Sequence, residues 1–181
     1  MTVTINLTLS PAAIVTGIGV CVVEGLEQTP AGAPDRQCLL LPTQTIPWDN
    51  CDCGGQFAQA ITSVYGADRF PIPADAKDWQ PCGPPWSVTR VLTSIVRCVP
   101  TMDEQAIPPT CAAEQAAAIT LENDRTAVRQ ALACCLTDLK TAGVIFHWSL
   151  GPSDTVGELG GCAGVETPYW FSTKSCLCGR F

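Results

Sequence analysis

The stretch CAAEQAAAITLENDRTAVRQALACCLTDLK, residues 111–140, is the most regular part of the chain. Its larger side chains step by three and four residues, the spacing that places them along one stripe of an α-helix. The double proline of IPPT comes just before Cys111, where such a helix would begin. This stretch therefore predicts one long helix. The positions that define its stripe are Ala118, Leu121, Arg125, Val128, Leu132, Cys135 and Leu139.

Segments typical of β-strands lie on both sides of this helix. Residues 88–99, VTRVLTSIVRCV, alternate between two sets of side chains, and residues 57–65 alternate small or polar with larger ones. The run 38–41, CLLL, predicts a short strand, and the tail after residue 142 predicts two strands around a Gly-rich loop. Ser10 followed by Pro11 predicts the N-cap and first residue of an N-terminal helix that runs to about Leu26.

The order of helix, strands, long helix and strands is typical of an α+β domain, with helices on one face of a mostly antiparallel sheet. The chain has 181 residues, enough for one domain of ordinary size, and it shows no internal repeat. Residues 1–181 therefore predict a single domain. The proline-rich connection 70–86, FPIPADAKDWQPCGPPW, predicts a loop suited to reach a neighbouring molecule.

Composition and charge exclude several classes of function. Charged residues make up only 15% of the chain, which suggests a surface covered by other subunits. The net charge is −7 and the ten basic residues are scattered singly, which argues against nucleic-acid binding. The apolar stretch 12–23 lacks a positive flank and is too short for a membrane span, so we expect neither a leader nor an anchor. The protein is expected to remain at first in the cytosol.

Twelve cysteines are unusual for a chain expected to fold in a reducing compartment. The close pairs are Cys51 with Cys53, Cys134 with Cys135, and the C-terminal CLC, and none has the C-x-x-C spacing of a zinc site. Disulfides fit these residues better than a metal does, and reduced, buried thiols remain an equal alternative. The candidate structural cysteines are Cys51, Cys53, Cys82, Cys98, Cys134, Cys135 and Cys162. We expect Cys51 and Cys53, if oxidised, to pair among Cys82, Cys98, Cys134 and Cys135.

The sequence offers little for catalysis. His147 is the only histidine, it lies between two aromatic residues in a predicted strand, and ordinary hydrogen bonding is the expected state of its ring. Asp52, Glu114, Asp124 and Glu158 could meet in space as an acid–base group, but no spacing favours this over solvated surface charge. A phosphate-binding glycine loop is absent from the sequence. We therefore expect a protein that is not an enzyme and that uses no metal or cofactor.

Several short motifs follow one another along the chain: WDNCDCG at 48–54, DRFP at 68–71, PCGP at 81–84, RCVPT at 97–101, CC at 134–135 and GGCAG at 160–164. Taken in this order, they resemble a family of small structural proteins encoded by long-tailed phages of actinobacteria, found among the head-to-tail connection genes and regarded as tail-terminator-like. The resemblance covers about residues 10–172. The tail from Lys174 to Phe181 lies outside it, as a C-terminal extension.

The resemblance implies a virion protein of the tail and neck, assembled in the host cytoplasm. It implies a ring, expected to be a hexamer, that caps the tail tube and joins it to the head–tail connector, while genomic DNA passes through without specific binding. The implied fold is a sheet with an N-terminal helix and a longer helix near the middle. The alternatives are another neck component (a stopper or adaptor) or a tail-tube subunit, and, from a different class, a cysteine-rich metal-binding module or a hydrolase that uses His147.

Overall fold

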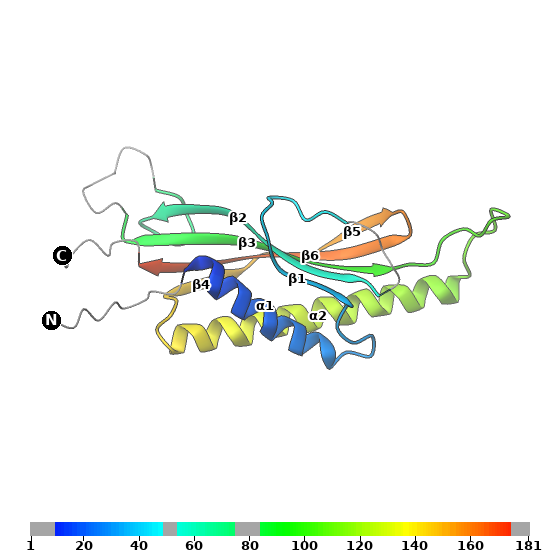
Figure 1. The fold of residues 1–181 in the computed structure, drawn as a ribbon, viewed down its shortest axis with the longest axis horizontal. Coiled ribbons are helices and arrows are strands. Elements are labelled where there is room, and N and C mark those ends of the chain that lie inside the picture. The colour runs from blue at the N-terminus through cyan, green and yellow to red at the C-terminus, as the bar shows by residue number, and fades with distance from the viewer. Residues whose placement is uncertain (1–9, 49–53, 75–83, 175–181) are drawn as a thin grey trace.

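The computed structural model of the protein describes residues 10–48, 54–74 and 84–174, and within them the chain forms two helices and a six-stranded sheet. The strand order is β1-β2-β3-β6-β4, and β5 pairs with another part of β6. β1 is parallel to β2 and all other pairs are antiparallel. Both helices lie on one face of the sheet (Figure 1), so the predicted α+β class is confirmed. The elements are α1 (Pro11–Glu27), β1 (Arg36–Leu41), β2 (Gln56–Ala67), β3 (Trp86–Cys98), α2 (Cys111–Thr141), β4 (His147–Leu150), β5 (Asp154–Leu159) and β6 (Cys162–Lys174).

Helix α1 begins where the sequence predicts. The Ser10 hydroxyl accepts a hydrogen bond from the Ala13 N–H at 3.2 Å, and Pro11 occupies the first turn. The helix buries one stripe against the sheet and against α2, formed by Ile14, Val15, Ile18, Val22, Val23 and Leu26. Gly25 allows the two helices to approach closely, since a Cβ added there would lie 2.9 Å from the Ala131 Cβ.

Helix α2 confirms the prediction over 111–140 to within one residue. Thr110 caps it through a hydrogen bond from the Ala113 N–H, and Glu114 and Lys140 lie in its first and last turns, where each charge complements the helix dipole. The buried stripe begins at Leu121 and continues through Leu136. The first turns of α2 are largely exposed and extend past the sheet, next to the projecting loop that follows β3 (Figure 1).

The main core lies between the helices and the sheet. Phe57 of β2 is paired in register with Ile95 of β3, and Ile95 with Val165 of β6, so side chains of the three long strands line up on the helix face. Tyr169 and Phe171 continue this face in β6, and both are fully buried. A smaller cluster on the opposite face consists of Ile46, Ala58 and Ala60, covered by the segment that follows β1.

The predicted pair of strands in the tail is wrong in number, because the described part of the tail contains three. β6 is 13 residues long, and it pairs with β4 over residues 169–172 and with β5 over residues 162–166. Gly151 and Pro152 interrupt the chain between β4 and β5, and the Gly151 N–H donates to the Pro168 carbonyl at 2.8 Å. Because of this break, β6 pairs with β4 along one part of its length and with β5 along another. In the described residues, neither helix is both long and apolar enough to cross a membrane.

Candidate functional site

Three of the sequence motifs converge at one end of the sheet. The ring of Trp48 lies over Gly164, where an added Cβ would be 3.0 Å from an indole carbon. Gly55 has φ 72°, and a Cβ there would lie 2.6 Å from the Val96 carbonyl oxygen, so this position needs glycine. The Val99 N–H donates to the Gly161 carbonyl at 2.9 Å, which ties the end of β3 to the turn before β6. Residues of the three motifs therefore contact one another at this end of the sheet.

The candidate cysteines fall into different environments. Cys51, Cys53 and Cys82 lie outside the described residues. Cys98 is half-buried at the end of β3, and Cys162 is buried at the start of β6 and disulfide-bonded. Cys134 is exposed on α2 and carries a free thiol, whereas Cys135 is buried. These last two differ because neighbouring residues on a helix point about 100° apart.

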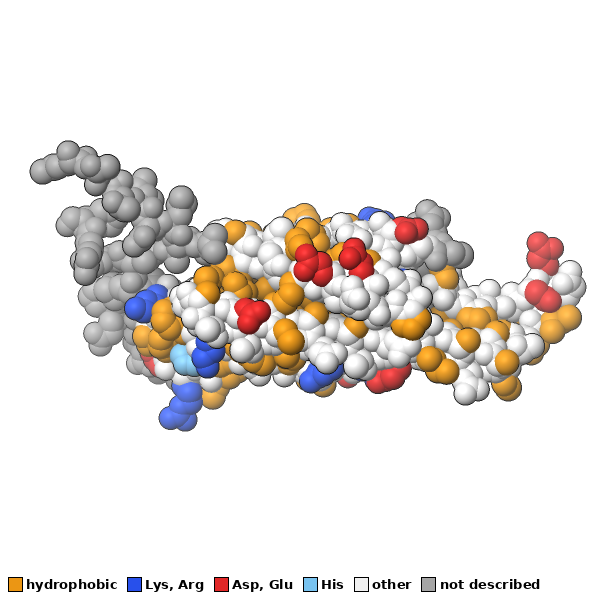
Figure 2. Space-filling view, turned by 90° about the horizontal axis from the view of Figure 1, so that it is seen from below, with side chains coloured by type: hydrophobic (Ala, Val, Ile, Leu, Met, Phe, Trp, Pro, Cys, Tyr) orange, Lys and Arg blue, Asp and Glu red, His pale blue; other side chains and the backbone are white. Residues whose placement is uncertain are grey.

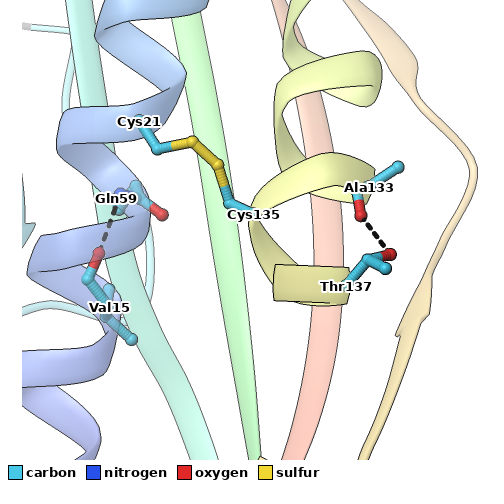
Figure 3. Close-up of a disulfide and its surroundings, with 6 residues drawn as sticks. All are labelled: Val15, Cys21, Gln59, Ala133, Cys135 and Thr137. Atoms are coloured by element: carbon cyan, nitrogen blue, oxygen red, sulfur yellow. Dashed lines mark hydrogen bonds between the residues drawn. A yellow bond between two sulfur atoms is a disulfide. The ribbon is translucent and has the colours of Figure 1, made fainter. Parts of the chain in front are cut away.

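Cys135 forms a disulfide with Cys21 of α1, a residue that the sequence argument did not single out. The bond joins the two helices across their interface (Figure 3), with the Cα atoms 6.6 Å apart, inside the usual range for a disulfide. This bond removes Cys135 from the four candidate partners of Cys51 and Cys53, and the expectation for those two residues lies outside the described part of the chain. The physical reason for the bond is that this face of α2 packs on α1, so the nearest thiol comes from the other helix.

A fully buried amide links α1 to the centre of the sheet. Gln59 Nε2 donates to the Val15 carbonyl at 3.4 Å (Figure 3), while Gln59 Oε1 accepts from the Tyr169 hydroxyl at 2.8 Å and from Thr93 Oγ1 at 3.4 Å. Burial raises the pKa of Tyr169 well above its ordinary value, so its hydroxyl stays protonated and can donate. The amide uses its polar atoms within the core and offers none to a ligand.

A buried ion pair fastens α2 to the sheet. Arg97 Nε lies 2.7 Å from Asp124 Oδ2 and Arg97 Nη2 lies 3.0 Å from Asp124 Oδ1, a bidentate geometry. Arg97 Nη2 also donates to the Gly32 carbonyl at 2.6 Å, in the turn after α1. Asp124 is fully buried, so removing either partner would leave a charge without compensation. The pair was not anticipated, because each residue alone reads as ordinary surface charge.

The predicted carboxylate candidates do not form an acid–base group in the described part of the chain. Asp124 is engaged by Arg97, and Glu114 is exposed ten residues earlier on the same helix. Asp52 lies outside the described residues, and the side chain of Glu158 is not described. Across residues 10–48, 54–74 and 84–174, no three His, Cys, Asp or Glu side chains are placed to hold a metal ion.

His147 is held in an aromatic group at the opposite end of the sheet. Its ring stacks on Phe70 with the centroids 5.6 Å apart and meets the edge of Trp86 at 4.9 Å. His147 Nδ1 lies 3.0 Å from Ser172 Oγ, which also accepts the His147 backbone N–H at 3.1 Å. Because Ser172 is fully buried, its hydroxyl positions β4 against β6 and is not open to a substrate.

An apolar groove lies between the first turns of α1 and the last turns of α2. Its volume is about 420 Å³, and its walls include Ala13, Gly17, Leu139 and Ala142 beside the disulfide. Asp138 is the acidic residue on its wall, and its side chain is exposed. The lining offers little polar chemistry, so the groove suits apolar side chains better than a charged ligand.

A scan of protein-family models finds none that matches this chain, and a search of curated proteins finds no match either. The residues described above form buried ties between elements and line an apolar groove.

Proposed function

We propose that the chain is a structural virion protein, a tail terminator that forms a ring on the tail tube and joins it to the head–tail connector. The observation that supports this most directly is the arrangement of a sheet with an N-terminal helix and a longer helix on one face, which is the fold that the family resemblance implies. Fold alone does not define a function, so the sequence motifs carry the rest of the proposal.

The internal polar groups support a passive role. Arg97 and Asp124 neutralise each other, and the Gln59 amide is satisfied by core partners. His147 is packed among aromatic rings and bonded to a buried serine. In the described residues, these ionisable and polar side chains therefore bond to other parts of the fold and hold its elements together. A scaffold needs this rigidity, because its function is to present surfaces in a fixed geometry.

The exposed surface supports association with other proteins. Large apolar side chains are exposed at Val20, Val64, Ile72, Met102, Ile107 and Ile119, several of them more than half exposed. On the sheet face away from the helices, the Arg90 guanidinium lies 5.6 Å from the centre of the Trp170 ring, and Leu92 and Pro168 are only half-buried. Apolar area of this kind is a favourable contact surface when subunits assemble.

The charge of the chain suits a channel for DNA. The net charge is −7, and repetition of the subunit around an axis multiplies it. Acidic walls repel the phosphate backbone, so a genome can slide past them without being bound. The Cys21–Cys135 disulfide fits the same life cycle, because a virion leaves the reducing host at lysis and its thiols can then oxidise.

The proposal is tested by electron microscopy of particles assembled without this chain. A missing terminator should give tails of uncontrolled length or heads and tails that fail to join. Joined tails of normal length would refute the proposal. Copy number separates the alternatives, since a terminator or another neck protein is present as one ring per particle and a tube subunit in many copies, which gel densitometry of purified particles measures.

A further inference from the structure

A hydrogen-bonded turn forms the tip of the loop after β3. The Asp103 N–H donates to the Ile107 carbonyl at 3.2 Å, and the Ala106 N–H donates to the Asp103 carbonyl at 3.0 Å. Asp103 Oδ1 accepts the N–H groups of Gln105 at 3.0 Å and Ile107 at 2.9 Å. Ala106 adopts φ 59°, a left-handed conformation that these bonds hold in place. We call residues 103–107 the tip turn.

The tip turn presents two apolar side chains to solvent. Met102, which precedes it, is 67% exposed, and Ile107, which closes it, is 60% exposed. The loop projects past the end of the sheet beside the first turns of α2 (Figure 1). Exposed apolar side chains on a preordered, projecting loop are characteristic of a docking element, because little conformational entropy is lost when the loop binds.

The α1–α2 groove lies at the other end of the molecule. α1 and α2 are antiparallel (Figure 1), so the groove lies at the C-terminal end of α2 and the tip turn beyond its N-terminal end, and α2 itself is about 46 Å long for its 31 residues. A Cβ added at Gly17 would meet nothing within 4 Å, which shows that this wall is open to an incoming side chain. Filling about 420 Å³ would release on the order of ten water molecules from mostly apolar surface.

The charges of the two ends are complementary. The tip turn carries exposed Asp103 and Glu104, while Lys140 in the last turn of α2 and Lys174 at the end of β6 lie at the groove end. Figure 2 shows acidic side chains on the projecting tip and basic side chains beside the histidine at the opposite end. Opposite charges at the two ends favour head-to-tail approach of two copies.

We propose that Met102 and Ile107 of one copy insert into the α1–α2 groove of the next copy of the same chain. Met102 and Ile107 form a knob at one end of the chain, and the groove lies at the other end, so the contact joins two different surfaces and is heterologous. Such a contact gives a closed ring when the rotation from each copy to the next brings the last copy back to the first. This inference rests on the proposed ring-forming function and names the surfaces that build the ring. It predicts that every copy uses both ends, so each subunit contributes one knob and one groove.

The first experiment measures the mass of the full-length chain over a concentration series by light scattering after size exclusion. A Met102→Asp and Ile107→Asp double variant places carboxylates in the groove near Asp138, and Gly17→Leu fills the groove while favouring the helix. Each should raise the concentration for half-assembly about tenfold or more. Ile72→Asp, at an exposed apolar residue that belongs to neither surface, should assemble like the natural chain.

The second experiment mixes the tip-turn variant with Gly17→Leu. The two are mixed at a concentration at which the natural chain assembles and each variant alone is monomeric. The mixture holds one intact pair of apolar tip residues and one intact groove, so assembly should stop at a heterodimer. If the natural chain assembles and both variants assemble at the same concentration as the natural chain, this contact is refuted while the ring proposal stands. If the natural chain remains a 19.1 kDa monomer at every concentration, both the contact and the ring are refuted.

Discussion

Removal of the Cys21–Cys135 disulfide by a double substitution to alanine should markedly destabilise the protein. The bond closes a loop with a sequence separation of 114 residues, which contains β1, β2, β3 and most of α2. The chain-entropy relation applied to this loop gives about 5 kcal/mol at 25 °C, and losses for native disulfides are typically about 2 to 5 kcal/mol. We therefore expect the free energy of unfolding to fall by about 2 to 5 kcal/mol.

The assay is urea unfolding of the oxidised natural chain and of the Cys21→Ala, Cys135→Ala variant, followed by circular dichroism. With a typical slope of about 2 kcal/mol per molar urea, the midpoint should fall by roughly 1 to 2.5 M. Substitution is preferable to a reducing agent, because a reductant would also cleave the disulfide of Cys162. Cys134→Ala is the matched control, since it removes the neighbouring exposed thiol and leaves the bond intact. An unchanged midpoint in the double variant would refute the view that this bond between the two helices stabilises the folded chain.

Three other substitutions test the buried and charged groups, each by the urea midpoint. Asp124→Asn should cost about 3 to 5 kcal/mol, because Arg97 would keep a buried charge without its carboxylate; a loss below 1 kcal/mol would contradict this. Tyr169→Phe should cost about 1 to 2 kcal/mol through the lost buried hydrogen bond, and no loss would show that the bond is not needed. Desolvation, and then the facing Asp154, raise the pKa of Glu166. The folded chain therefore binds this proton more tightly than the unfolded chain does. Above the raised pKa the carboxylate is ionised in the folded chain, which lowers the free energy of unfolding. Glu166→Gln should therefore raise the midpoint at pH 7 and leave it unchanged below the ordinary value of 4.5, whereas an equal effect at both pH values would contradict the assignment.

Periodicity predicts the regular elements of this fold well. The stripe of α2, the Ser10-Pro11 start of α1 and the alternation of β3 all depend on local geometry, so a single segment contains the whole signal. Periodicity does not predict the Gly151-Pro152 break between β4 and β5. It lies in a region read as one strand and a loop, and only the length of β6 makes room for two short partners.

Long-range pairings could not be predicted in the same way. The Cys21–Cys135 bond depends on which face of α2 meets α1, and neither cysteine has a distinctive spacing from the other. Arg97 and Asp124 each look like a solvated charge when read along the chain, and they become a buried pair only through tertiary packing. The tip turn is similar, because its shape depends on hydrogen bonds of Asp103 that composition alone does not reveal.

Imaging of the assembled particle at side-chain resolution tests the central claim most directly. We predict one ring of this chain between the tail tube and the head–tail connector, with Met102 and Ile107 of each copy seated in the α1–α2 groove of its neighbour. Density for the chain as an isolated monomer, or its repetition along the whole tube, would contradict the assignment as a terminator.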